Sequence, residues 1–394
     1  MLCKPSWYRW VLAFSLVACL SAGAVGLLQD AGGGLVVAGM SVAQAADEGR
    51  SFNDPPQSLK EPGARRDTDD GIDRLLDAVR VEEGVRYRGL TLFPVTLRKD
   101  YGDFTPRTFD EAVERGDLRI EEKERAEVNT VRVRNDGSRP VFIMAGEILT
   151  GSKQDRTVRR DALISPHSGW VDLPVYCVEA GRWVQKTPHF GTRQSLASPA
   201  LRADAYGGAG QQVIWDQVDR AAKAQGVEQS QARAFQEIYD SPAVRERLKD
   251  YVDNLPIPRD RRVVGLVAYA HGVVVGADLF ASSEVFERLR EKLIRSYVLA
   301  VDPRERPGSE ERATARDAAR FLAGAWSENC LRLHEDAIDM GENLRLRSRG
   351  WGVRGAALVY REDVVHLSLF PAEEIDILPF KGMEQTPVPR ERDF

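Results

Sequence analysis

Two segments of the chain each place a carboxylate and then cations directly after an apolar run. The apolar runs begin at Val141 and Val171. The polar side chains that follow are Glu147, Lys153, Gln154 and Arg156 in the first segment and Glu179, Arg182 and Trp183 in the second. Paired carboxylates can serve as general acid and base or hold a divalent metal together. Arginine suits bidentate contact with phosphate or carboxylate, and tryptophan stacks on rings. These residue types indicate a site for a small anionic or nucleotide-like ligand.

The two glutamates are the candidate catalytic residues, and the other side chains are the candidate binding residues. In this interpretation Glu147 and Glu179 act on the ligand, while Lys153, Gln154, Arg156, Arg182 and Trp183 hold it. Strand ends of antiparallel neighbours can meet, so we expect one pocket beneath a mobile loop from Phe190 to Gly210. The competing interpretation is structural. Each arginine would pair with a glutamate and tie the strand ends together, because charged clusters are only probabilistic markers of sites.

Cys177 and the histidines indicate neither a nucleophile nor a metal site. Cys177 shares a strand face with Glu179, and no histidine is near it in sequence to lower the pKa of its thiol. Cysteine is also among the residue types most often buried for packing. The histidines, at positions 167, 189, 271, 334 and 366, lack the close spacing of zinc ligands. We expect them on loops or at the surface, and we predict no metal.

Both segments resemble the motifs of one protein family. The matching residues are Gly146-Glu147, Gly151, Lys153 to Arg156, Pro174-Val175 and Cys177 to Trp183, with a weaker match from Gln212 to Trp215. The family is the ADP-ribosylglycohydrolase- and rhodanese/phosphatase-associated protein domain, and the resemblance covers the stretch from Leu90 to Asn254. It implies a shared fold and site and an association with ADP-ribose or nucleotide metabolism, with no established activity. The export signal described below departs from the intracellular members of the family.

The order of the expected elements favours an α+β fold with mainly antiparallel sheet. Residues 72–190 form a β-rich half that carries the motifs, and residues 191–380 form a half of mixed helices and hairpins. Hairpins interleaved with helices argue against the regular strand and helix alternation of a doubly wound parallel sheet.

The β-rich half should position the motifs through pairs of strands. Leu90 to Leu97 is expected as an edge strand, because Pro94 cannot donate to a ladder. The runs on either side of Asp136-Gly137 should form a hairpin that ends at Ala145, since Asp-Gly between alternating runs is a hairpin signal. The segments within 162–178 should form the next pair.

Helix signals are local and specific. Thr108 and Glu111 have the spacing of a capping box. Further helices are expected at Val213 to Gln225, from Pro242, from Ser283 with the apolar stripe Phe286, Leu289, Leu293 and Tyr297, and at Ala315 to Trp326. Two late hairpins should turn at Ala270 to Gly272 and at Arg361 to Asp363.

The N-terminus has the pattern of a secretory signal. Lys4 and Arg9 precede an apolar run, and Ala43-Gln-Ala45 is a small-x-small cleavage site. This predicts a signal peptide over residues 1–45 and export to the periplasm or the extracellular space. Two alternatives remain: a lipoprotein with its lipid at Cys19, and an uncleaved anchor. Contact with a membrane is expected only in those two cases.

Residues 46–71 are rich in proline and charge and predict a flexible lead-in, and residues 381–394 predict a loose tail.

Composition narrows the partners. The chain is 43% hydrophobic and 29% charged, with a net charge of −5, so it lacks the electrostatic footprint of a nucleic-acid binder. We expect an exported domain that binds a phosphorylated or nucleotide-like small molecule, with or without catalysis. The alternative is a non-catalytic interaction or scaffold module of the cell envelope. The identity of any cofactor stays unknown, and the pairing of Cys177 with Cys330 stays open.

Overall fold

The computed structural model describes residues 67–372, apart from residues 100, 103, 124–128, 183, 260–261, 305–312, 349 and 351. The chain divides into two units, Met1–Ser51 and Phe52–Phe394, and the described residues belong to the second. The predicted signal peptide, Cys19 and the C-terminal tail therefore lie outside the described residues. Helix α1 (Asp67–Ala78) begins before Ile72, where we expected the lead-in to end.

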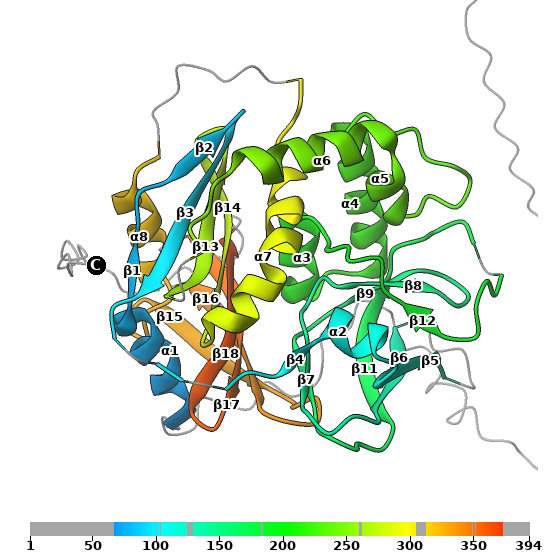
Figure 1. Cartoon of the computed structure of the whole chain (residues 1–394), viewed down its shortest axis with the longest axis horizontal. Helices are drawn as coiled ribbons and strands as arrows, with labels where there is room; N and C mark the ends of the chain where they lie inside the picture. The colour runs from blue at the N-terminus through cyan, green and yellow to red at the C-terminus, as the bar shows by residue number, and fades with distance from the viewer. Residues whose placement is uncertain are drawn as a thin grey trace, which may run out of the picture. The chain divides into compact units, whose positions relative to one another are not determined.

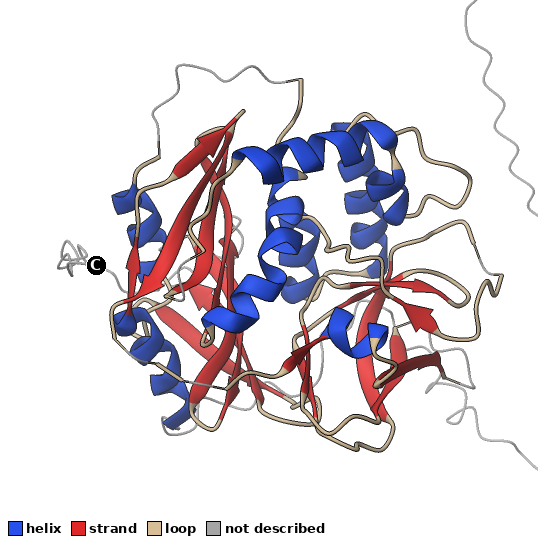
Figure 2. Cartoon of the chain, in the orientation of Figure 1, coloured by secondary structure: helices blue, strands red, loops and turns tan. Residues whose placement is uncertain are grey.

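The largest sheet is antiparallel throughout and has the strand order β1-β3-β13-β14-β18-β17-β16-β15, with β2 also paired to β3 (Figures 1 and 2). Its strands are β1 (Val79–Val81), β2 (Val85–Tyr87), β3 (Leu90–Leu97), β13 (Val263–Ala270), β14 (Val273–Phe280), β15 (Cys330–Glu335), β16 (Glu342–Ser348), β17 (Val353–Tyr360) and β18 (Asp363–Pro371). It joins an early strand to the last hairpins of the chain.

Helices cover both faces of this sheet. Successive strand residues point to opposite faces. In β13, Leu266 and Ala268 belong to the hydrophobic cluster that contains α7, whereas Val267 and Tyr269 belong to the cluster that contains α1 and α8 (Ala315–Ala323). Figure 1 shows α1 and α8 on the opposite side of the sheet from the remaining helices.

Two smaller sheets carry the motif segments. One has the order β10-β7-β4, and the other has the order β12-β8-β9-β11-β6-β5. Their strands are β4 (Arg107–Thr108), β5 (Leu118–Glu122), β6 (Thr130–Asn135), β7 (Val141–Ile143), β8 (Ile148–Gly151), β9 (Arg156–Val158), β10 (Ala162–Ile164), β11 (Val171–Cys177) and β12 (Phe190–Gly191). Both motif segments therefore follow strands of these small sheets.

The remaining helices are α2 (Phe109–Glu114), α3 (Pro199–Gly207), α4 (Gln211–Ala224), α5 (Gln236–Asp240), α6 (Pro242–Asn254) and α7 (Ser283–Val298). The capping box of α2 is confirmed, because the Glu111 carboxylate accepts the backbone N–H of Thr108 at 2.9 Å. The apolar stripe of α7 is confirmed as well, since its four predicted residues are all buried. The N-cap of α7 is Ser282, one residue earlier than predicted.

The α+β fold with mainly antiparallel sheet is confirmed. Both late hairpins form as predicted, β13 with β14 and β17 with β18.

The predicted hairpin around Asp136-Gly137 is wrong. Strand β6 pairs with β5 and β11, whereas β7 pairs with β10 and β4. The turn is closed by buried Asn135, whose amide donates to the carbonyl of Arg139 at 2.8 Å and to that of Ser165 at 3.0 Å. These bonds lead the chain out of one sheet and into another. The predicted pair within 162–178 is wrong for the same reason, because its two strands also lie in different sheets.

The edge position of Pro94 is wrong too, because β3 is paired on both sides. On one side, however, β2 pairs with Leu90 to Leu92 and β1 pairs with Val95 to Leu97. Pro94 lies between these two ladders, where the missing N–H of proline is tolerated.

The expected mobile loop from Phe190 to Gly210 is instead largely ordered structure. It contains β12 and helix α3, whose residues Leu201 and Arg202 are fully buried. Ser198 and Pro199 supply the N-cap and first-turn proline that predict a helix start. The small residues around them mask this signal in the sequence.

Candidate functional site

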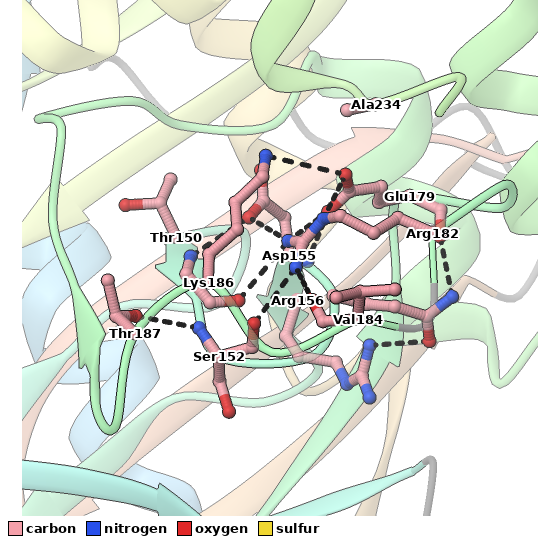
Figure 3. A network of polar contacts seen from close by, with 12 residues as sticks. Thr150, Ser152, Asp155, Arg156, Glu179, Arg182, Val184, Lys186, Thr187 and Ala234 are labelled. Carbon is pink, nitrogen blue, oxygen red and sulfur yellow. Dashed lines mark hydrogen bonds and ion pairs between the residues drawn. The ribbon is translucent and has the colours of Figure 1, made fainter. Parts of the chain in front are cut away.

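Arg182 is the centre of a tightly bonded cluster (Figure 3). Its acceptors are the Glu179 carboxylate at 2.6 and 2.5 Å and the carbonyls of Ser152 at 2.9 Å, Val184 at 2.7 Å and Gly151 at 3.3 Å. A guanidinium has five N–H groups, and each of them finds an acceptor here. Arg182 therefore clamps the first motif segment to the second.

Glu179 is the buried anion of this clamp, with a side chain only 1% exposed. Its carboxylate accepts the backbone N–H of Asp155 at 2.8 Å, and its carbonyl accepts the side-chain amide of Gln154 at 2.8 Å. The exposed ammonium of Lys186 lies 3.9 Å from the same carboxylate. Both oxygens are thus committed to the protein's own donors.

The second motif segment is also held from its other side. Glu179 forms a backbone bridge with Ala234, and the Gly181 N–H donates to the carbonyl of Ala232 at 2.9 Å. A Cβ on Gly181 would lie 1.8 Å from the carbonyl oxygen of Gln231, so only glycine fits. This close approach explains the glycine of the Glu-Ala-Gly-Arg segment.

Arg156 differs sharply from Arg182. Its side chain is fully buried, yet it makes two hydrogen bonds, to the Gln154 side-chain oxygen at 3.1 Å and to the Glu122 carboxylate at 3.5 Å. Its Nε has no partner among the described residues, and the same holds for the Glu122 Oε2 atom. A buried cation normally needs a close counter-charge, and Arg156 has a distant one.

The loop between these arginines is strained. Gly151 and Ser152 have φ values of +111° and +45°, and positive φ is uncommon for serine. The Ser152 N–H donates to the Thr187 hydroxyl at 2.9 Å, and its carbonyl accepts the N–H of Lys186 at 2.8 Å. The Ser152 hydroxyl is buried with no partner among the described residues. Such strain often accompanies sites that hold a ligand.

Cys177 packs beneath this loop as a protonated thiol. Burial raises the pKa of Cys177, and its Sγ donates to the carbonyl of Glu179 at 3.2 Å. Cys177 and Cys330 are both free and buried. The charge of Arg156 acts to lower the pKa of this thiol, but burial outweighs it, so the thiol is not activated as a nucleophile.

Glu147 has a different set of partners from Glu179. Its carboxylate accepts from Lys292 at 2.6 Å, and Lys292 also pairs with Asp110. The Glu147 Oε1 atom has no partner within the described part of the chain. Burial raises the pKa of Glu147 to about 7, with a further rise from the charge of Asp110 and an opposing effect of Lys292.

The candidate residues are therefore brought together only in part. Gln154, Arg156, Glu179 and Arg182 form one hydrogen-bonded group, which we call the motif network. Lys153 is half-buried in the same loop. Glu147 contacts Lys292 instead of a member of this group, and Trp183 lies outside the described residues.

A second buried network was missed by the sequence analysis. His366 bridges two carboxylates, with Nδ1 2.7 Å from Asp161 and Nε2 3.0 Å from Asp278. Arg202 donates to both oxygens of Asp278, at 2.9 and 2.5 Å. We call these four residues the core network. All four side chains are at most 1% exposed, so the expectation that His366 lies on a loop or at the surface is wrong.

The charges of the core network balance. Although burial alone would lower the pKa of His366, Asp161 and Asp278 together raise it to about 9. Burial opposes ionisation of Asp278 as well, but Arg202 and His366 hold its pKa below the usual range. Two cations therefore face two anions.

One arrangement in the core resembles the nucleophile, base and carboxylate of a hydrolase, with Ser368 beside His366 and His366 beside Asp161. The Ser368 Oγ lies 3.5 Å from the His366 Nε2, but it donates to Asp278 and accepts from Arg202 at 2.7 Å. All of these side chains are buried, with no exposure at Ser368. The Ser368 hydroxyl is committed to Asp278 and Arg202 instead of to His366, so the arrangement is structural.

Two signals in the sequence point to the core network. Asp278 is a charged residue within the apolar strand β14. His366 and Ser368 are polar residues two positions apart on one face of β18, and Ser368 lies directly opposite Asp278 in the strand pairing. A Cβ on Gly146 would lie 2.6 Å from the Arg202 Cγ, and Gly146 has φ +92°. The first motif glycine therefore makes room for the core arginine.

No group of three or more His, Cys, Asp or Glu side chains in the described part of the chain is arranged to hold a metal ion. Within the same residues, no helix combines the length and apolar character needed to cross a membrane.

Comparison with known proteins gives one result. A sequence model of the ARG and Rhodanese-Phosphatase-superfamily-associated Protein domain matches residues 78–370. Neither the curated proteins nor the solved structures contain a match to this chain.

Proposed function

We propose that this chain, which belongs to the ARG and Rhodanese-Phosphatase-superfamily-associated Protein domain family, binds a small anionic ligand. We also propose that it is an exported domain. The ligand would be phosphorylated or nucleotide-like, and its anionic group would contact Arg156. Export is supported by the pattern of Lys4, Arg9 and Ala43-Gln-Ala45. Mass spectrometry of the mature N-terminus tests that part, with residue 46 as the expected first residue.

The observation that carries the proposal is the incomplete bonding of Arg156. This guanidinium is fully buried, its nearest carboxylate oxygen is 3.5 Å away, and its Nε has no partner among the described residues. Buried polar groups are almost always satisfied in native proteins, so exceptions need an explanation. A phosphate or carboxylate beside Arg156 would supply the missing acceptors.

The neighbouring residues would complete this site. Gln154 already contacts Arg156, and the Ser152 hydroxyl supplies a further unpaired group from the strained loop. Lys153 follows in the same loop and would add a cation, and Trp183 would stack on a base or sugar ring. Arg182 holds the loop in place and is a positioning residue, because all of its N–H groups are used.

The site supports binding better than catalysis. Glu179 is committed to Arg182 and to the N–H of Asp155, so it has no free oxygen with which to move a proton. Glu147 has a pKa near neutrality but belongs to another set of contacts.

One observation favours a second candidate function. The saturation of Arg182 is what a structural lock would show, and it supports the alternative of a non-catalytic envelope interaction module. The two functions differ in what they require of Arg156, since only the first needs its guanidinium to contact a ligand.

Thermal shift with phosphate, AMP, ADP-ribose, sugars and divalent metals separates these functions, because a bound ligand raises apparent stability by mass action. We expect an anionic compound to raise the melting temperature of the wild-type protein. Arg156→Met should remove this response while the variant remains folded. Arg233→Met, which removes an exposed arginine paired with Asp219, is the matched control and should respond like wild type. An equal response in Arg156→Met and in the control would exclude this site.

A further inference from the structure

A cavity of about 260 Å³ lies on the helical side of the molecule, away from the motif network. It is formed by α5, by the start of α6, by the second half of α7 and by the segment that precedes α3. Its lining includes Arg193, Arg245 and Arg295, and it includes no residue of the motif network. Nothing in the function proposed above uses it.

Four cations, Arg193, Arg245, Lys249 and Arg295, line the cavity together with one carboxylate, Asp240. Lys249 and Arg295 pair with Asp253 and Glu291 just outside the lining, so the local excess is one positive charge, at Arg245. Clefts lined by one sign of charge attract ligands of the opposite sign.

These cations are available to a ligand. Arg193 pairs with Asp240 at 2.8 Å, but both side chains are about half exposed, at 54% and 43%. Arg295 pairs with Glu291 one helical turn away. Exposed pairs of this kind contribute little to stability, so an anion can compete for them. Arg245 is exposed and has no ion-pair partner in the part of the chain that the structure describes.

The floor of the cavity adds an unpaired acceptor. Gln236 is 5% exposed and lines the cavity, and its Nε2 donates to Asp240 at 3.2 Å. Its Oε1 is buried and has no partner among the described residues. An amide oxygen in this position needs a donor such as a hydroxyl.

The floor is also rigid. The Tyr239 hydroxyl donates to the carbonyl of Leu196 at 2.7 Å, and the carbonyl of Ser195 accepts the N–H of Ile148 at 3.1 Å. The first bond joins α5 to the segment before α3, and the second joins that segment to strand β8, so these residues are fixed in position. Tyr239 also lines the cavity.

We propose that this cavity is a second binding site and that it takes a phosphorylated sugar or polyol. The phosphate would contact Arg245, with Arg193 and Arg295 beside it. A hydroxyl of the carbon skeleton would donate to the Gln236 Oε1, and the apolar face of the skeleton would pack on Tyr239. The cations select the anion, and the unpaired amide oxygen selects the hydroxyl.

This site is independent of the one at Arg156. It is lined by other residues and would exist whether or not the motif network binds a ligand. A variant of either site therefore serves as a control for the other.

Isothermal titration of the exported protein with glucose 6-phosphate, inorganic phosphate and glucose tests the proposal. We expect glucose 6-phosphate to bind at least tenfold more tightly than either of the other two compounds. Arg245→Ala should weaken its binding at least tenfold, because the variant loses the cation that has no protein partner. Gln236→Leu should weaken the binding of glucose 6-phosphate but leave the affinity for inorganic phosphate unchanged. Arg220→Ala, an exposed arginine on α4 outside the cavity, should bind like wild type.

Three results would overturn the proposal: no binding of glucose 6-phosphate, equal affinity for glucose 6-phosphate and phosphate, or full binding by Arg245→Ala. Arg156→Met must retain the binding. If Arg156→Met loses it while Arg245→Ala keeps it, the ligand belongs to the motif network and the cavity proposal fails.

Discussion

The motif network and the core network bury the same kinds of groups but satisfy them to different degrees. In the core network, Arg202 donates twice to Asp278 and His366 bridges two carboxylates. In the motif network, Arg182 is closely paired with Glu179, but the carboxylate oxygen nearest to the fully buried Arg156 is 3.5 Å away.

This difference separates structural charge from functional charge better than burial does. All three arginines are buried or nearly so, at 0%, 0% and 10% exposure for Arg202, Arg156 and Arg182. What differs is the distance to the counter-charge, because the Nε of Arg202 lacks a partner among the described residues just as that of Arg156 does. A closely paired buried charge fixes the fold, whereas a loosely paired one leaves a guanidinium that a ligand's anionic group can pair with.

The largest effect is expected in the core network. Asp278→Asn keeps the shape of the side chain but leaves Arg202 and protonated His366 without their shared anion. Breaking a buried pair in this way costs about 3–5 kcal/mol, so we expect a loss of that size in the free energy of unfolding measured with urea. Asp253→Asn, at an exposed pair with Lys249, is the matched control and should change stability by about 0.5 kcal/mol or less. A loss at Asp278 no larger than that of the control would contradict the structural role of the network.

Arg182→Met should have the next largest effect. The variant leaves the buried Glu179 carboxylate without its main partner and frees the carbonyls of Ser152 and Val184. We expect a loss of about 3 kcal/mol, at the lower end for a buried pair, because exposed Lys186 can move closer to Glu179. The same urea titration measures it. A change below that of Arg233→Met would mean that the clamp does not hold the loop.

Stability should fall as the pH rises from 5 to 9. The pKa of Glu147 is raised from 4.5 to about 7, so the folded state holds a proton that the unfolded state releases, and stability falls across that window. The pKa of His366 is raised from 6.5 to about 9, so its contribution is complete below 6.5 and is lost as the pH rises through 9. Each shift corresponds to at most about 3 kcal/mol. Melting temperatures at pH 5, 7 and 9 measure the trend.

Glu147→Gln divides this trend into its two parts. The amide does not titrate, so the decrease between pH 5 and pH 7 should shrink while the decrease between pH 7 and pH 9 persists. If the variant keeps the full decrease at low pH, another group is responsible for it.

Elements with local signals could be predicted from the sequence. The capping box of Thr108 and Glu111 and the apolar stripe of α7 depend on neighbours within a few turns, and both form as expected. The hairpin at His271 follows from its short turn in the same way.

Features that depend on partners far along the chain could not be predicted. Asp136-Gly137 has the residues of a hairpin turn, but Asn135 directs the two strands to different sheets. Arg202, Asp278 and His366 are separated by 76 and 88 residues, so their meeting depends on the order of strands in the large sheet. For the site, the sequence correctly placed Arg182 beside Glu179, but it could not show that Arg156 would stay incompletely bonded.

The smallest effect is expected for Arg156→Met, and it is the sharpest test of the comparison. Methionine fills much of the same space, removes the charge and leaves the Glu122 carboxylate, which is 11% exposed and only loosely paired. Removal of the buried Arg156 charge relieves its desolvation penalty and also removes its two hydrogen bonds. These two contributions to the free energy of unfolding should be of similar size and opposite sign. We therefore expect a change within about 1 kcal/mol, in either direction, in the urea titration. Arg182→Met, in the turn after the neighbouring strand β11 and equally conservative in volume, is the matched comparison. A loss at Arg156 as large as that at Arg182 would show that Arg156 is a structural charge, and the proposed ligand contact would then lose its physical basis.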